Sequence, residues 1–296
     1  MNEPHTYLFK QAHDCSIYAD VYPAGGPGPH PAILWLHGGA LIFGDRTSLS
    51  PAEAQVYLND GYTVVTADYR IAPETKLEAI VEDVQDAYRW LVRQGPALFN
   101  IDPARIAVIG PSAGGYLTLL MGHRVSPRPR ALVSFYGYGD IVGAWYSCPD
   151  PYYSQQPRVT DEDARSAVGT SPLAGSTSME RFMFYLYTRQ NGVWAKEVAG
   201  HDPAHEPAWF EPYCPLRNVG ADYPPTLLIH GDQDTDVPCE QSRLMAAELA
   251  RCGVAHELVI VPGHGHNFDH QGDGLRDPVV AGVYARVQAF LRERMG

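Results

Sequence analysis

Six short, almost continuous apolar runs limit this sequence to a small set of folds. They occupy residues 32–36, 63–67, 106–109, 131–135, 226–229 and 257–261. Runs of this length and character are typical of strands that are buried on both faces of a sheet. Between several of these runs, apolar residues recur at helical spacing, within residues 79–91, 244–249 and 283–291. The alternation of strand and helix predicts an α/β protein with a mainly parallel, doubly wound sheet.

A further strand is predicted near the N-terminus, at residues 15–22. There, Cys, Ile, Ala and Val alternate with Ser, Tyr, Asp and Tyr. Strict alternation is the pattern of a strand with only one buried face, so we expect this strand at an edge of the sheet.

One interval is too long for a single connecting helix. Residues 138–222 comprise 85 residues between two predicted strands, and 13 of them are aromatic. We interpret this interval as an inserted cap, with residues 1–137 and 223–296 forming the core domain. About half of the aromatic residues are expected to form the core of the cap itself, and the rest are expected to line a pocket.

Composition excludes several classes of function. The net charge of -12 argues against nucleic acid and anionic membrane as partners, because both select for basic surfaces. The first twenty residues lack the uninterrupted apolar stretch of a signal peptide, so a cytoplasmic location is expected. The five cysteines form no Cys-x-x-Cys pair, which indicates neither a disulfide framework nor a zinc site.

Ser112 is the candidate nucleophile. It lies in Gly110-Pro-Ser-Ala-Gly-Gly115, after the predicted strand 106–109 and before a helical stretch at residues 116–123. A turn from strand to helix within so few residues forces the central serine into a strained conformation and leaves its hydroxyl exposed at the tip. The alternative is an ordinary strand-to-helix turn, which needs no catalytic serine.

A serine hydroxyl needs a histidine to accept its proton and a carboxylate to orient that histidine. Asp234 follows the strand 226–229 and His266 follows the strand 257–261, so both lie where parallel sheets place their sites. The choice within each loop stays open at this point. The alternative acids are Asp232, Asp236 and, after the strand 131–135, Asp140; the alternative base is His264.

An oxyanion hole is predicted at two glycine-rich turns. Gly39 and Ala40, in the sequence Leu36-His-Gly-Gly-Ala40, follow a buried strand and are the expected donors, with Gly38 as an alternative. Ala113 is the expected second donor, because it follows the nucleophile at the start of a helix, where backbone N–H groups are unpaired.

No cofactor or metal ion is predicted. His201 and His205 have the spacing of a helical metal-binding pair, but Pro203 lies between them and no further ligands are evident. The chain also lacks the glycine-rich motifs that bind nucleotides.

Five ordered motifs together resemble the α/β-hydrolase superfamily, and within it the carboxylesterases grouped with hormone-sensitive lipase. They are His37-Gly-Gly-Ala40, Asp68-Tyr-Arg-Ile-Ala-Pro-Glu74, Gly110-Pro-Ser-Ala-Gly-Gly115, His230-Gly-x-x-Asp-x-x-Val-Pro238 and His266-Asn-Phe268. The resemblance implies a sheet of about eight strands with the cap inserted after the sixth. It also implies a catalytic triad of Ser112, Asp234 and His266.

The chain departs from that family at three points. Ala40 replaces the usual third glycine, and Pro111 replaces the acidic residue that commonly precedes the nucleophile. The oxyanion motif also begins too early to leave room for the family's N-terminal helical cap. The insertion at residues 138–222 instead resembles the capping of other esterases and of kynurenine-formamidase-like hydrolases.

The resemblance thus implies a serine carboxylesterase that acts on small to medium, largely apolar esters through an acyl-enzyme. An aryl formamidase, an amidase or a small peptidase would use the same three residues. A hydrolase-fold protein that only binds a small apolar ligand is a different kind of alternative, and it would be expected if the triad were incomplete. A small-molecule ester is the expected partner, and the sequence does not indicate an oligomeric state.

Overall fold

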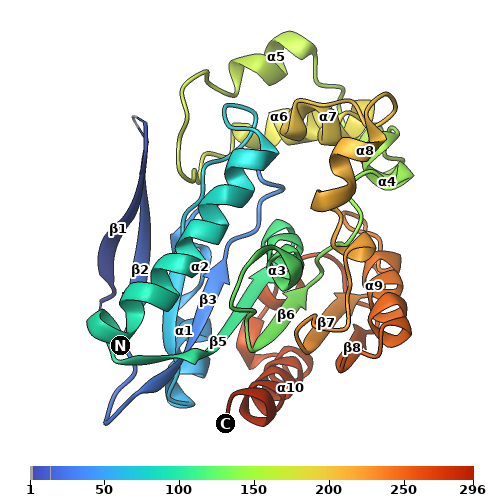
Figure 1. The fold of residues 1–296 in the computed structure, drawn as a ribbon. Helices are drawn as coiled ribbons and strands as arrows, with labels where there is room; N and C mark the ends of the chain where they lie inside the picture. The colour runs from blue at the N-terminus through green and yellow to red at the C-terminus, as the bar shows by residue number, and fades with distance from the viewer. Residues whose placement is uncertain (1–2, 14) are drawn as a thin grey trace.

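The computed structural model describes residues 3–13 and 15–296. These residues form one eight-stranded sheet with helices on both faces (Figure 1). In order across the sheet, the strands are β1 (His5–Ala12), β2 (Cys15–Tyr22), β4 (Thr63–Ala67), β3 (His30–Leu36), β5 (Ile101–Pro111), β6 (Ala131–Phe135), β7 (Thr226–Gly231) and β8 (His256–Val261). β2 pairs in antiparallel fashion with β1 and with β4, and the neighbours from β4 to β8 are all parallel. The prediction of a mainly parallel sheet is confirmed.

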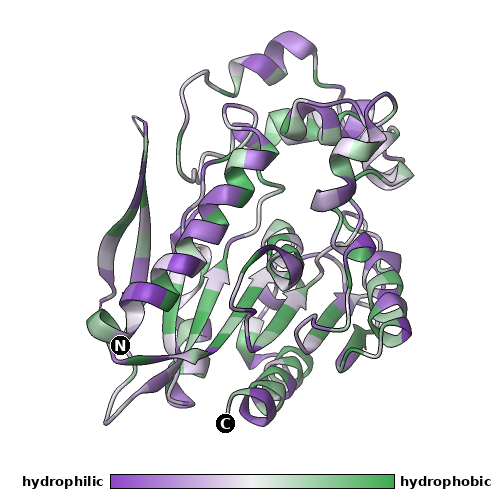
Figure 2. Ribbon diagram, in the orientation of Figure 1, coloured by the Kyte–Doolittle hydropathy of each residue, from purple (hydrophilic) through white to green (hydrophobic). Residues whose placement is uncertain are grey.

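Alternate side chains of the central strands fill two separate cores. In β3, Leu34 packs into a core with α2 (Leu77–Phe99), α3 (Ala113–Arg124) and α9 (Glu240–Arg251). Its neighbour Trp35 packs into a core with α1 (Pro51–Asn59) and α10 (Pro278–Met295) on the other face. Both faces are therefore covered, which explains why the strands are apolar at almost every position. Figure 2 shows hydrophobic residues along these strands and hydrophilic residues on the outer side of helices such as α2.

The two edges of the sheet differ from the prediction. β1 forms the outer edge beyond β2, so residues 15–22 are not an edge strand. Lys10 of β1 lies 2.8 Å from a carboxylate oxygen of Asp83 and 2.6 Å from one of Asp86, and these ion pairs hold the added strand against α2. At the other edge, most residues of β8 are only half-buried, because β8 has a neighbouring strand on one side alone.

The long interval between β6 and β7 forms a helical layer over the sheet. It contains α4 (Ala144–Ser147), α5 (Asp161–Ser166), α6 (Arg181–Asn191), α7 (Trp194–Ala199) and α8 (Pro207–Phe210). Figure 1 shows these helices together at the end of the molecule toward which the parallel strands point. We call residues 138–222 the insertion. Among residues 3–13 and 15–296, no helix combines the length and apolar character needed to span a membrane.

A buried arginine fastens the insertion to the core. The guanidinium of Arg181, at the start of α6, donates hydrogen bonds of 2.8 and 2.7 Å to the two carboxylate oxygens of Glu74. It also donates to the carbonyl oxygens of Ile42 and Ala72, each at 2.6 Å. The two charged side chains are only 5% and 0% exposed. The position of α6 over the sheet is thus set by a fully paired buried charge.

Candidate active site

Ser112 occupies a sharp turn between β5 and α3. Its φ of 53° and ψ of -121° lie outside the regions that L-residues ordinarily adopt. The turn is tight enough that a Cβ atom at Gly114 would lie 2.0 Å from the carbonyl oxygen of Leu36. A Cβ atom at Gly110 would lie 2.5 Å from the backbone of Gly114. Only glycine fits these two positions, which explains the Gly-x-Ser-x-Gly pattern around the serine.

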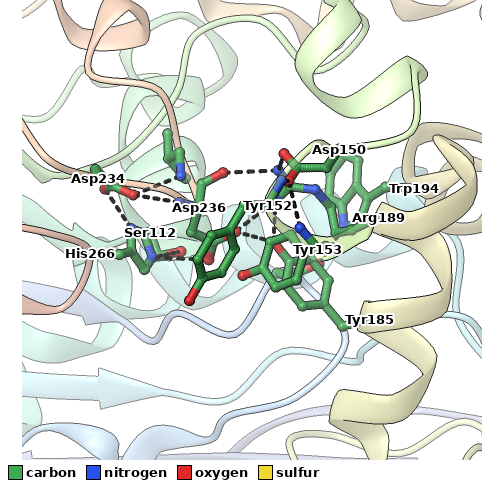
Figure 3. A network of polar contacts seen from close by, with 12 residues as sticks. Ser112, Asp150, Tyr152, Tyr153, Tyr185, Arg189, Trp194, Asp234, Asp236 and His266 are labelled. Atoms are coloured by element: carbon green, nitrogen blue, oxygen red, sulfur yellow. Dashed lines mark hydrogen bonds and ion pairs between the residues drawn. The ribbon is translucent and has the colours of Figure 1, made fainter. Parts of the chain in front are cut away.

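Three side chains from separate loops form a continuous chain of hydrogen bonds. Nε2 of His266 lies 3.0 Å from Oγ of Ser112, and Nδ1 of His266 donates to Oδ2 of Asp234 at 2.7 Å. The second carboxylate oxygen of Asp234 accepts the backbone N–H groups of Asp236 and Val237 at 2.8 and 2.9 Å. Figure 3 shows these residues converging at one end of a larger polar network. The geometry allows a proton to pass from the serine hydroxyl to the imidazole.

Electrostatics favour an ionised Asp234 and a basic His266. Burial opposes ionisation of Asp234, but hydrogen bonds from His230 and His266 outweigh it and hold the pKa of the carboxyl below its usual range. Burial also opposes protonation of His266, but the charges of Asp236 and Asp234 outweigh it and raise the pKa of the imidazole. The site therefore stabilises a protonated imidazole, which is the state that follows deprotonation of a serine.

None of the alternative acids pairs with Nδ1 of His266 in the described structure. The carboxylates of Asp232 and Asp140 each accept a backbone N–H, at 2.7 and 2.9 Å, and neither contacts His266 within the described residues. Asp236 does approach His266, but at Nε2 rather than Nδ1, with a separation of 3.5 Å. Asp234 is thus the acid that the structure places at Nδ1 of His266.

The alternative base His264 makes its contacts within its own loop. Its Nδ1 donates to the carbonyl oxygen of Pro262 at 2.8 Å, and its ring packs edge-on against Phe268. Of the two histidines in this loop, only His266 contacts Ser112 in the described structure.

The predicted oxyanion residues surround the serine. Gly39 and Ala40 line the same pocket as Ser112, and their N–H groups donate none of the backbone hydrogen bonds found in the described loops. Ala40 has a φ of 54°, a left-handed conformation that a third glycine would adopt without strain. The indole N–H of Trp194 donates to the carbonyl oxygen of Ala40 at 3.0 Å and holds this turn in place. Ala113 is buried at the first position of α3 and does not itself line the pocket.

The pocket above Ser112 has a volume of about 750 Å³. Four of the insertion's aromatic residues line it, namely Tyr152, Tyr153, Phe182 and Tyr185. This is fewer than the predicted half, because most of the others are buried in stacks such as those of Tyr146 with Trp145 and Trp194. The opposite wall is polar and includes Asn267, His270 and Gln271. The pocket is therefore less uniformly apolar than the sequence indicated.

His201 and His205 do not converge on a common point. Nδ1 of His201 lies 2.8 Å from Glu206, whereas Nδ1 of His205 lies 3.4 Å from Asp202. The ring of His201 also stacks on Trp209. Each histidine is thus occupied by its own local contact.

The one group in the described residues with metal-ligand spacing is Glu53, Asp269 and His270. The sequence did not suggest it, because Glu53 lies more than 200 residues from the other two. Its carboxylates already accept hydrogen bonds from the hydroxyl groups of Tyr136 and Tyr284, so the group is a satisfied polar cluster rather than an open ligand set.

The chain resembles known proteins along most of its length. Residues 19–249 match the BD-FAE family. The ethyl acetate hydrolase of Pseudomonas putida is 28% identical over 246 residues, which cover 81% of this chain and 67% of that protein. The non-reducing polyketide synthase Preu6 of Preussia isomera is 26% identical over 298 residues, which cover 89% of this chain. The matched segment makes up only 14% of that synthase, so the chain corresponds to a small part of it.

Solved structures share the fold at low sequence identity. A protein of unknown function from Staphylococcus aureus subsp. aureus Mu50 superimposes with a TM-score of 0.80, 23% identity and full coverage of both chains. The propionate-bound esterase 2 of Thermogutta terrifontis gives a TM-score of 0.71 and 21% identity over 98% of this chain and 94% of the esterase. An α/β-hydrolase superfamily protein from Enterococcus faecalis gives a TM-score of 0.78 and 22% identity over 98% of this chain and 99% of that protein. The chain therefore belongs to the BD-FAE family, and it shares the fold of the α/β-hydrolase superfamily protein from Enterococcus faecalis.

Proposed function

We propose that this protein is a serine carboxylesterase with Ser112 as nucleophile, His266 as general base and Asp234 as the orienting acid. The observation that carries the proposal is the unbroken chain of contacts from Asp234 through His266 to Ser112, at 2.7 and 3.0 Å, at the floor of a large pocket. The ethyl acetate hydrolase and esterase relatives agree with this reaction type.

The contacts among these residues support the following acylation step. His266 removes the hydroxyl proton of Ser112 as Oγ attacks the ester carbonyl carbon, and Asp234 stabilises the resulting imidazolium. The carbonyl oxygen becomes an oxyanion, to which the N–H groups of Gly39, Ala40 and Ala113 are proposed to donate. The intermediate then collapses, the alcohol leaves with the proton held at Nε2 of His266, and the acyl group stays on Ser112.

Deacylation reverses these roles with water. His266 takes a proton from the water that attacks the acyl-enzyme, and it returns that proton to Oγ of Ser112 as the carboxylic acid leaves. Neither half-reaction needs a metal ion or cofactor, and we predict that the protein uses none. A cytoplasmic location also stays a prediction.

The insertion is proposed to act as a specificity cap, with residues 1–137 and 223–296 as the core domain. It supplies the aromatic wall of the pocket, and a walled pocket suits short to medium acyl or aryl groups better than long lipid chains. We therefore expect p-nitrophenyl esters of about two to eight carbons to be hydrolysed faster than emulsified triglycerides.

Kinetics of matched serine variants test the proposal. Ser112→Ala should lower kcat/KM for p-nitrophenyl butyrate by at least about a thousandfold without unfolding the protein. Ser166→Ala, on the exposed helix α5, is the control and should retain the wild-type rate. A formanilide assayed in parallel separates ester from amide chemistry. Retention of more than about a tenth of the activity by Ser112→Ala would refute the assignment.

A further inference from the structure

An arginine of the insertion is buried beside the reaction centre. Arg189, near the end of α6, is 1% exposed and lies among the rings of Trp145, Tyr146, Tyr153 and Tyr185, at 4.8 to 5.7 Å. Such a charge is costly to bury unless it is paired. The need for partners therefore decides which residues Arg189 contacts.

Two carboxylates pair with Arg189, and one of them reaches the active site. The guanidinium donates to Asp150 at 2.6 Å, to Oδ1 of Asp236 at 2.6 Å and to the backbone carbonyl of Asp236 at 3.0 Å. The hydroxyl group of Tyr185 donates to the same Oδ1 of Asp236. Figure 3 shows the resulting network, which runs from α6 to the loop that carries Asp234.

The other oxygen of Asp236 faces the catalytic histidine. Oδ2 lies 3.5 Å from Nε2 of His266, and this is the nitrogen that lies 3.0 Å from Oγ of Ser112. His266 therefore lies between two carboxylates, with Asp234 at Nδ1 and Asp236 at Nε2.

We propose that Asp236 is a positioning residue of the reaction, which stabilises protonated His266 from the Nε2 side while Arg189 limits the strength of that interaction. This inference rests on the proposed function. An unpaired carboxylate at this distance would hold the proton on His266 and compete with the leaving alcohol for it. Because Arg189 and Tyr185 hold Oδ1, only part of the charge of Asp236 acts on the imidazole.

The remaining groups around His266 allow the effect of Asp236 to be isolated. Asp234 accepts from Nδ1, and the ring of Tyr136 packs edge-on against the imidazole with Asp269 behind it. Burial lowers the pKa of His266, and the charges of Asp236, Asp234 and Asp269 raise it. Of these carboxylates, only Asp236 pairs with an arginine of the insertion in the described structure.

The pH dependence of kcat/KM for p-nitrophenyl butyrate tests the inference. A carboxylate 3.5 Å from the imidazole moves the protonation midpoint of the ring to higher pH by about one unit even when the pair is fully hydrated. Pairing of Asp236 with Arg189 makes this effect smaller. Asp236→Asn should therefore move the midpoint of the acid limb to lower pH by at least about 0.5 unit. Arg189→Gln should move it to higher pH, and Arg189→Lys should keep it near the wild-type position.

Opposite shifts from the two partners of one ion pair distinguish this role from a structural one. A merely structural pair would lower activity in both variants without moving the acid limb. Asp232→Asn is the matched control, because it removes a charge from the same loop without a contact to His266, and its acid limb should not move.

If Arg189→Gln does not fold, Asp236→Asn alone still tests the inference, because asparagine preserves the shape of the aspartate side chain. An active Asp236→Asn enzyme whose acid limb coincides with that of the wild type would overturn the inference. If activity in that variant still depended on Ser112, the proposed function would remain; if activity never depended on Ser112, the proposed function itself would fail.

Discussion

Replacing Arg181 by methionine tests whether the insertion is fastened to the core as the structure indicates. The substitution keeps an unbranched apolar chain but removes all four hydrogen bonds to Glu74, Ile42 and Ala72. Glu74 then remains buried without an ion-pair partner among the described residues, although the backbone N–H of Gly169 still donates to it. Breaking a buried ion pair from one side costs about 3 to 5 kcal/mol, well above the average for point substitutions of about 1 kcal/mol.

The loss should also depend on pH. Burial opposes ionisation of Glu74, but its bonds to Arg181 outweigh this and lower the pKa of the carboxyl, so the wild type loses stability as the pH falls through that pKa. Without Arg181 only backbone hydrogen bonds such as that from Gly169 still oppose the effect of burial, so the pKa of Glu74 rises relative to the wild type. The folded variant then gains from protonation as the pH falls, and the stability difference between variant and wild type should shrink from pH 7 to pH 5.

Denaturant unfolding at both pH values measures these effects. The control is Arg128→Met, which breaks an exposed ion pair with Asp222 and should cost less than about 1 kcal/mol. A loss for Arg181→Met below about 1 kcal/mol at pH 7, or a loss that does not change with pH, would contradict a stabilising ion pair between Arg181 and Glu74.

Three further predictions concern the buried histidine, the charge of the pocket and its size. Burial lowers the pKa of His37 to about 4, so this residue makes the wild type lose about 2 kcal/mol of unfolding free energy between pH 7 and pH 5. Over the same pH range, His37→Asn should lose about 2 kcal/mol less than the wild type, measured by denaturant unfolding. The lining of the pocket includes Asp236 but neither lysine nor arginine among the described residues, so p-nitrophenyl hemisuccinate should show kcat/KM at least about tenfold below that of the butyrate ester. Phe182→Ala should shift the preferred acyl chain toward greater length, whereas Trp209→Ala, outside the pocket, should not. Identical chain-length profiles for Phe182→Ala and the wild type would contradict a role of the insertion in substrate specificity.

The strands and the three loops of the site could be predicted because their signals are local. Buried parallel strands are apolar throughout, and the tight turn at Ser112 requires glycine at Gly110 and Gly114. β1 was missed because its pattern is irregular, with a shift in register between Leu8 and Lys10. The order of strands across the sheet likewise depends on contacts between distant segments.

The network around Arg189 could not be predicted, because its partners come from three separate segments. Arg189 lies 39 residues from Asp150 and 47 residues from Asp236, and nothing within any one segment indicates the others. The only local signal is the spacing of Arg181, Tyr185 and Arg189, which places all three on one face of α6. Arg181 and Arg189 lie on the same face of a helix in the insertion, and the predicted catalytic loops are rich in aspartate. Together these two features would have indicated ion pairs between the insertion and the core.

Active-site labelling tests whether Ser112 is the nucleophile. A fluorophosphonate reacts much faster with a serine that is activated by a neighbouring base than with other hydroxyl groups, and peptide mapping by mass spectrometry identifies the residue that carries the adduct. We predict one stable adduct per chain, on Ser112, with loss of esterase activity in proportion to labelling and no labelling of Ser112→Ala. An adduct on another residue, or full inactivation without modification of Ser112, would contradict it.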